Sequence, residues 1–300
     1  MSKTKIWIKA FRLRTLPLSV SGVIMGSFIA LKRGAFNWNV FILAIATTLF
    51  LQILSNLAND YGDSKNGKDN AGRLGPVRTV QSGAVSLLEM KRMILFFCLL
   101  SLVSGVLLIF ISQIPILSLS FFTLLFLGLV AIYAALSYTI GKNPYGYSGW
   151  GDLSVFIFFG LFSVLGTFFL FAKSLTADIL LPAISVGAFS VGVLNLNNMR
   201  DIVNDKATGK RTLVVKMGAR KAKYYHIFLL ILPIVNSVTF LTLEHCKWIS
   251  YCFVVILVPI CLHARRIVRI NEPALFDKEL KKLALIALAF SLLFGICINL

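Results

Sequence analysis

Nine long apolar stretches run through the sequence, and they constrain the fold more than any other feature. A helix needs about 17–25 mostly apolar residues to cross a lipid bilayer. Hydrophobic residues make up 58% of the 300 residues, more than a soluble domain can bury. None of the stretches alternates like the strands of an outer-membrane barrel. The sequence therefore predicts an all-α, polytopic membrane protein, a single domain over residues 1–300, with nine transmembrane helices near 16–31, 36–57, 93–112, 117–138, 153–172, 179–198, 224–243, 248–263 and 283–300.

The basic residues are divided unevenly between the two sides of the membrane that these stretches define. The formal net charge is +18, and 26 of the 30 Lys and Arg residues fall in the amino-terminal tail and in every second loop after it. Loops rich in Lys and Arg stay in the cytoplasm, so the amino terminus is predicted to be cytoplasmic. No nucleic-acid partner is expected, because membrane topology and contact with anionic lipid account for the charge.

Two polar clusters follow the second and sixth apolar stretches, on the predicted cytoplasmic side. Each begins Asn-Leu-x-Asn and continues with carboxylates at spacings of three and four residues, which directs oxygens to one face of a helix. Charged side chains are costly in or near hydrocarbon and usually have a function there. The first cluster comprises Asn56, Asn59, Asp60, Asp63 and Asp69, and the second comprises Asn195, Asn198, Asp201 and Asp205.

The donor atoms of these clusters favour Mg²⁺. Oxygen ligands without His or Cys suit a hard cation, and Mg²⁺ often completes its coordination with substrate phosphates. Two such clusters facing each other would hold a diphosphate between metal ions. The alternative for one cluster alone is an ordinary helix end with solvated ion pairs. Gly209 is expected to end the helix that carries the second cluster. Basic residues able to contact phosphate flank both clusters, namely Lys65, Arg73, Arg78, Arg200 and Lys210.

At these residues the sequence resembles the UbiA-like intramembrane aromatic prenyltransferases over essentially its whole length. That family has aspartate-rich motifs at the ends of the second and sixth of nine helices. They match Asn59-Asp60-x-x-Asp63 with Asp69, and Asp201-x-x-x-Asp205. The strings at residues 75–83, 197–201 and 209–213 are most similar to the family's 1,4-dihydroxy-2-naphthoate branch. Where that branch has Glu after the fourth helix, this chain has Asp152, which leaves the role of Asp152 open.

The resemblance implies nine helices around a central cavity and a role for each matching residue. Mg²⁺ would be held by Asn59, Asp63, Asp69, Asp201 and Asp205, with Asn56, Asn195 and Asn198 as further polar groups of the pocket. The diphosphate would be bound by Lys65, Arg73, Arg78, Lys142, Arg200 and Lys210. Catalytic roles would fall to Asp60, Tyr138 and Lys142, with Tyr138 beside the allylic cation and Lys142 beside the diphosphate.

The resemblance also implies a reaction and a location. The substrates would be an all-trans polyprenyl diphosphate and 1,4-dihydroxy-2-naphthoate, and the product a demethylmenaquinol after loss of CO₂ and diphosphate. One alternative is another aromatic acceptor, such as 4-hydroxybenzoate or homogentisate. The other is a membrane transporter, although transporters usually bind at the membrane midplane, whereas these acids gather at one face. The protein is expected in the bacterial cytoplasmic (inner) membrane, among lipid, with its active site on the cytoplasmic side.

Overall fold

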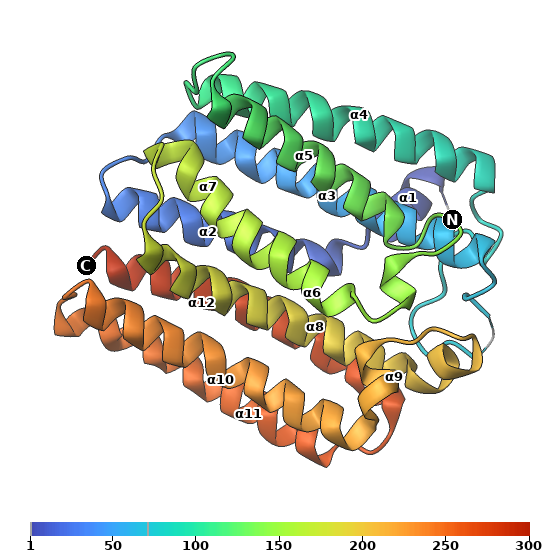
Figure 1. Cartoon of the computed structure of the whole chain (residues 1–300). Helices are drawn as coiled ribbons and strands as arrows, with labels where there is room; N and C mark the ends of the chain where they lie inside the picture. The colour runs from blue at the N-terminus through green and yellow to red at the C-terminus, as the bar shows by residue number, and fades with distance from the viewer. Residues whose placement is uncertain (1, 71) are drawn as a thin grey trace.

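The computed structural model describes residues 2–70 and 72–300 as a bundle of long helices that run roughly side by side (Figure 1). Within those residues, nine segments are long and apolar enough to cross a membrane, which confirms the predicted number. Each overlaps one predicted stretch, so the chain is a multi-pass membrane protein. The segments are Lys3–Lys32, Trp38–Lys65, Leu87–Ile111, Leu119–Ser137, Gly151–Ala172, Ala177–Ala207, Ala219–Leu243, Trp248–Arg269 and Pro273–Ile298.

Several spans combine more than one helix. The first joins two α-helices through a short 3₁₀ turn, and the fifth contains a π-helical segment, a feature often found near functional sites. The α-helices are α1 (Lys3–Phe11), α2 (Leu16–Lys32), α3 (Trp38–Lys65), α4 (Leu87–Ile111), α5 (Leu119–Ser137), α6 (Gly151–Val155), α7 (Ser163–Ala172), α8 (Leu180–Ala207), α9 (Leu213–Met217), α10 (Ala219–Leu243), α11 (Leu257–Arg269) and α12 (Phe276–Ile298). The 3₁₀ helices are η1 (Leu13–Thr15), η2 (Tyr145–Tyr147), η4 (Ala177–Ile179), η5 (Trp248–Ile256) and η6 (Pro273–Leu275), and the π-helix is η3 (Phe156–Phe162).

The helices α3 and α8 are longer than a bilayer requires. Each has 28 residues, about 42 Å at 1.5 Å per residue, against a hydrocarbon core of about 30 Å. Asn37 caps the start of α3 by accepting a hydrogen bond from the backbone of Asn39. Gly209 follows the end of α8 with a φ of +76°, as predicted. The last turns of both helices can therefore project out of the hydrocarbon and carry polar residues.

The helix α8 lies in the middle of the bundle, whereas α5 lies at its edge. In the span that contains α8, 78% of the most apolar stretch of residues is buried inside the bundle, compared with 11% in the span formed by α5. Close packing against η3 depends on glycine, because a Cβ on Gly160 would lie 2.6 Å from Cα of Gly187. The face of α5 that is left uncovered is suited to contact with lipid.

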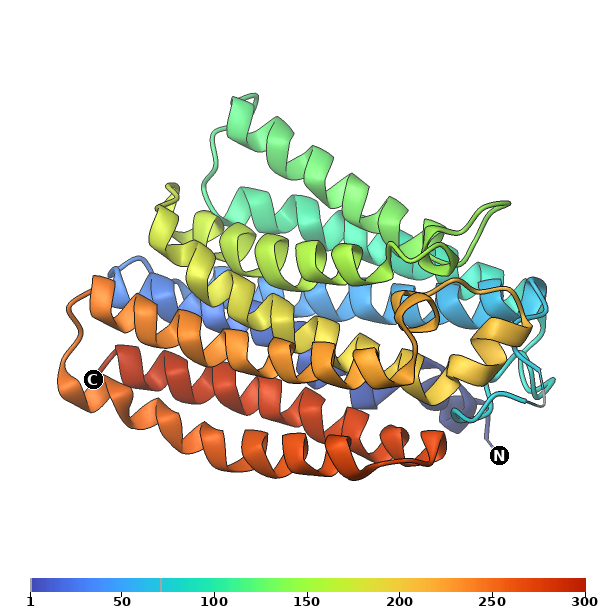
Figure 2. The same ribbon diagram turned by 60° about the horizontal axis from the view of Figure 1, so that its bottom comes forward.

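The polar connections that follow α3 and α8 gather at one end of the bundle. Figure 2 shows the loop after α3 and the turn between α8 and α9 at the same end. A Cβ on Gly62 would lie 2.6 Å from the carbonyl oxygen of Thr139, so this glycine lets the end of α3 pack closely against the loop after α5. The helix α1 and the carboxyl end of α12 lie at opposite ends (Figure 1), as an odd number of spans requires. The two polar clusters of the sequence are thus brought together.

Candidate active site

A cavity of about 400 Å³ runs between the helices from this polar end into the bundle. Its outer part is lined by carboxylates, amides and basic side chains. Its inner part is lined mainly by apolar groups, among them Leu108, Leu124, Phe159, Phe162 and Leu170. The fold therefore contains the predicted central cavity, with a charged mouth and an apolar interior.

Three residues of each polar cluster face this cavity. From α3 the side chains of Asn56, Asn59 and Asp63 line it, and from α8 those of Asn198, Asp201 and Asp205 do so. The common face that was predicted from spacings of three and four residues is present in each helix. The three carboxylates are almost completely buried, so their charges need partners close by.

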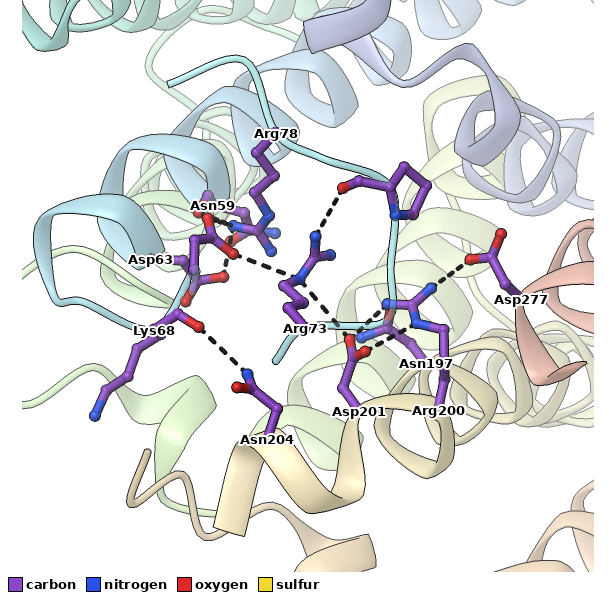
Figure 3. Close-up of polar contacts among 12 residues, drawn as sticks. Asn59, Asp63, Lys68, Arg73, Arg78, Asn197, Arg200, Asp201, Asn204 and Asp277 are labelled. Atoms are coloured by element: carbon purple, nitrogen blue, oxygen red, sulfur yellow. Dashed lines mark hydrogen bonds and ion pairs between the residues drawn. The ribbon is translucent and has the colours of Figure 1, made fainter. Parts of the chain in front are cut away.

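Two arginines from the loop between α3 and α4 supply some of those partners (Figure 3). Nη1 of Arg78 lies 2.6 Å from Oδ2 of Asp63 and 3.2 Å from Oδ2 of Asp69. Nε of Arg73 lies 3.4 Å from Oδ1 of Asp69 and 4.0 Å from Oδ2 of Asp201. Burial raises the pKa of the Asp69 carboxyl, and the charge of Arg78 opposes that rise. Arg73 therefore connects the motif on α3 to the motif on α8.

Asp63 has two further partners. Oη of Tyr147 donates a hydrogen bond of 2.5 Å to Oδ1 of Asp63, and Nζ of Lys210 lies 3.0 Å from the same oxygen. The ammonium group of Lys210 also lies 4.8 Å from the ring centroid of Tyr147, a cation–π contact. Burial, and then the Asp63 carboxylate, raise the pKa of the Tyr147 phenol, so this group stays protonated and donates.

Arg200 is buried beside the cavity rather than in its lining. Its guanidinium donates to both carboxylate oxygens of Asp201, at 3.0 and 2.5 Å, to Asp277 at 2.5 Å and to Asn197 at 2.8 Å. These contacts use most of its five donors. Arg200 thus fixes the orientation of Asp201, and the structure does not place it where it could contact a diphosphate.

Asp60, one residue after Asn59, points away from the cavity. Its Oδ2 accepts hydrogen bonds from the backbone nitrogen of Thr79 at 3.0 Å and from the Thr79 hydroxyl at 2.6 Å, and its Oδ1 accepts from the nitrogen of Val80 at 3.4 Å. Asp60 therefore anchors the loop that carries Arg78. This position corrects the expectation that Asp60 lies among the reacting groups.

The other predicted residues lie in the cavity wall, in the buried interior or at the surface. Tyr138 lines the cavity, and burial raises the pKa of its phenol. Asn195 is buried outside the lining, and its side-chain amide has no hydrogen-bond partner among the described residues. Lys65 and Lys142 are exposed and do not line the cavity. The structure therefore does not bring these two lysines to the predicted site.

Comparison with known proteins shows the family to which the chain belongs. A family model described as the UbiA prenyltransferase family matches residues 19–297. The chain belongs to this family. The family assignment agrees with the two aspartate motifs that converge at the mouth of the cavity.

The family includes relatives that match almost the whole chain. One is 1,4-dihydroxy-2-naphthoate octaprenyltransferase of Haemophilus influenzae, 38% identical over 296 residues, which cover 98% of this chain and 96% of the relative. The protein of the same name from Escherichia coli is 39% identical over 295 residues, which cover 98% and 95%.

A solved structure of the family has the same fold. A UbiA homolog from Archaeoglobus fulgidus, bound to GPP and Mg²⁺, matches with a TM-score of 0.68 at 12% identity, covering 98% of this chain and all of that one. At this low identity the likeness concerns the fold alone.

The donor set of this UbiA-family chain fits a magnesium ion that is shared with a substrate. Among residues 2–70 and 72–300, no group of three His, Cys, Asp or Glu side chains could hold a metal by itself. Mg²⁺, however, usually takes one or two carboxylates from protein and adds water and phosphate oxygens. The described residues at the cavity mouth supply such oxygens, and the cavity lining contains no His or Cys.

Sequence reasoning missed several residues of the site. Arg12, Tyr147 and Asn204 line the cavity, yet none belongs to a matched motif. Asn204 carries a weak signal, because it lies three residues after Asp201 and so shares its helical face. Tyr147 lies in an irregular connection, where no periodicity indicates which way a side chain points. Arg12 belongs to the basic tail, whose charge is accounted for by membrane topology alone.

Proposed function

We propose that this protein transfers a polyprenyl chain from a polyprenyl diphosphate to 1,4-dihydroxy-2-naphthoate, giving a demethylmenaquinol, CO₂ and diphosphate. The observation that carries the proposal is the near-complete alignment, at 38% and 39% identity, with two proteins named for this naphthoate. The cavity is consistent with it, because a charged mouth suits a diphosphate and an apolar interior suits an isoprenoid tail.

The charged mouth would bind the diphosphate. Asn59, Asp63, Asp201 and Asp205 would hold Mg²⁺, and Asp69 would contribute by positioning Arg73 and Arg78. Mg²⁺ would neutralise the leaving group. Arg73, Arg78 and Lys210 line the cavity beside these acids and would donate hydrogen bonds to phosphate oxygens as negative charge develops.

The inner cavity would carry out the rest of the reaction. The allylic C–O bond breaks, a ring carbon of the electron-rich naphthoate forms the new C–C bond, and the carboxyl group leaves as CO₂. The aromatic residues Tyr138, Phe159 and Phe162 line the cavity and would shield the allylic carbon from water. Lys142 has no part in this proposal, because it is exposed.

We further propose that the site opens to the cytoplasm from the bacterial cytoplasmic membrane. The support is electrostatic: 26 of the 30 Lys and Arg residues lie in the tail, the loops and the helix ends on the side of the bundle that carries the site. Such asymmetry sets the orientation of bacterial membrane proteins. Both substrates would then approach from the cytoplasmic side.

A product assay tests the acceptor. The purified protein in lipid is given Mg²⁺, a series of all-trans prenyl diphosphates, and either 1,4-dihydroxy-2-naphthoate or 4-hydroxybenzoate. Mass spectrometry should detect the decarboxylated, prenylated naphthoquinol only with the naphthoate. Prenylation of 4-hydroxybenzoate without any naphthoquinol product would overturn the proposed acceptor while leaving prenyl transfer in place.

A further inference from the structure

Arg12 differs from the other basic residues that line the cavity, because it has no carboxylate partner. Arg73, Arg78 and Lys210 are paired with acids of the two motifs, and Arg14 lies 3.2 Å from Asp277. Among the described residues, Arg12 forms no ion pair, and its buried Nη2 has no hydrogen-bond partner. The Asp60 and Asp63 carboxylates act on this guanidinium only from beyond ion-pair distance, and the positive charges of Arg73 and Arg78 oppose them. Because a cation in the cavity wall without a paired carboxylate is costly, a ligand with negative charge would complete this part of the cavity.

The turn that carries Arg12 is held firmly against the cavity wall. Nδ2 of Asn56 donates to the carbonyl oxygen of Phe11 at 2.9 Å and to the hydroxyl of Thr15 at 3.0 Å, on either side of Arg12. Nε2 of Gln52 donates to Oδ1 of Asn56 at 3.2 Å. Arg12 itself has a φ of +52°, which is uncommon for a residue with a long side chain. The guanidinium is therefore presented from a fixed position.

The turn that carries Arg12 lies on the inner side of the proposed diphosphate site, although its guanidinium stays near enough to Asp63 and Arg78 for their charges to act on it. Asn56, which holds the turn, precedes Asp63 by seven residues on α3, a rise of about 10 Å towards the apolar interior. A prenyl diphosphate bound with its charged end at Asp63 and its tail in the apolar part would extend its reacting carbon in this direction. The Arg12 turn thus lies beside the place where an acceptor ring must bind.

We propose that Arg12 binds the carboxylate of the aromatic acceptor. The planar guanidinium can contact both oxygens of a carboxylate. The surrounding wall offers the neutral polar groups of Thr15, Ser19, Gln52 and Asn56, all of which line the cavity, for ring hydroxyls. Arg12 would thereby select an aromatic acid over the same ring without its carboxylate. This inference rests on the proposed function, since it assigns the acceptor subsite of the same reaction.

The test compares two acceptors and two variants. Wild type and Arg12→Gln are assayed with 1,4-dihydroxy-2-naphthoate and with 1,4-dihydroxynaphthalene, which lacks the carboxylate. Loss of a charged hydrogen-bonded contact should raise the KM for the acid by on the order of 10- to 100-fold. The KM for the diol and for the prenyl diphosphate should stay within about twofold. Lys9→Gln, which removes an exposed positive charge three residues earlier, is the matched control and should change nothing.

Each other outcome decides against the inference. An equal loss for acid and diol, or a rise in the KM for the prenyl diphosphate, would place Arg12 at the ring or at the diphosphate instead. Unchanged kinetics would remove Arg12 from the site. If Arg12→Gln does not fold, Arg12→Lys decides by the same comparison, because it keeps the charge but loses the two-point contact.

Calorimetric titration of 1,4-dihydroxy-2-naphthoate without a prenyl donor separates this inference from the proposed function. Wild-type protein that binds the acid through Arg12 but forms no prenylated product would refute the proposed reaction and keep the subsite. Wild-type protein that prenylates the naphthoate, while Arg12→Gln binds it equally well, would refute the subsite and keep the reaction.

Discussion

Nη1 of Arg78 lies 2.6 Å from Oδ2 of Asp63, so a cation of the loop after α3 already contacts a proposed metal ligand. The same guanidinium nitrogen lies 3.2 Å from Asp69. Arg78 and a divalent cation would share Asp63, with phosphate oxygens as the natural new partners for the arginine once substrate binds. The loop is therefore part of the site and not merely a connection between spans.

Arg78→Ala should lower kcat/KM for the prenyl diphosphate by about 100-fold or more, because a cation beside the breaking C–O bond stabilises charge that develops in the transition state. Lys142→Ala and Lys281→Ala remove exposed lysines and should change kcat/KM by less than about threefold. The measurement is steady-state kinetics in vesicles. Equal losses in all three variants would mean that the basic residues act as a diffuse field.

Asp63→Asn and Asp201→Asn should each reduce turnover by about 100-fold or more, since each removes a negative charge from the proposed metal site. The amide is similar in shape, so insertion into the membrane should persist. Asp178→Asn is the matched control, because Asp178 pairs with Arg33 at the opposite end of the bundle. Near-normal activity in either motif variant, at equal expression, would exclude that residue as a ligand.

Asp60 should act through the loop that it anchors. Asp60→Asn weakens the acceptor of three hydrogen bonds from Thr79 and Val80 and should lower kcat/KM by about 10-fold. If Asp60 works by positioning Arg78, the double variant with Arg78→Ala should be no less active than Arg78→Ala alone. Additive losses in this cycle would indicate a separate role for Asp60.

The pattern of the sequence predicted the spans and the facing motifs because both depend on local regularity. The periodicity of α3 places Asn56, Asn59 and Asp63 on one face whatever the rest of the chain does. Asp60 follows Asn59 directly and belongs to the same acidic motif, so the sequence alone suggests a place in the site. Its contact with Thr79, where the loop returns to α3, shows instead that its side chain points to that loop. Asp60 and Thr79 are 19 positions apart, and a contact that depends on a loop folding back leaves no periodic pattern in the sequence.

Lys142 and Arg12 also show what local sequence patterns do not predict: Lys142 was expected in the site and lies at the surface, whereas Arg12 was not expected there and lines the cavity. A Tyr-x-x-x-Lys pattern brings the two side chains together only if a helix continues through both. The helix α5 ends at Ser137, and Gly141 has a φ of +120°, so Lys142 turns to the surface. Arg12 lies in a tail whose charge fits membrane topology, and only its place in the cavity lining, with a buried and unpartnered Nη2, distinguishes it.

Removal of divalent cations should abolish prenyl transfer, and added Mg²⁺ should restore it. Because no described group of three acidic, His or Cys side chains could hold a metal alone, a chelator without substrate should leave the melting temperature unchanged within about 2 °C. Mg²⁺ together with a prenyl diphosphate should raise it through binding to the folded state. Unfolding caused by the chelator alone would instead reveal a resident structural metal.

Cysteine labelling should establish which end of the bundle faces the cytoplasm. Asn37 precedes α3 and Ala207 ends α8, both are exposed, and they lie at opposite ends of the bundle. In an active variant without its native cysteines, a membrane-impermeant maleimide applied to intact cells should label Asn37→Cys and not Ala207→Cys. In inverted membranes the result should reverse, because the charge distribution places the site end in the cytoplasm. Labelling of Ala207→Cys from outside intact cells would overturn the proposed orientation and, with it, the cytoplasmic active site.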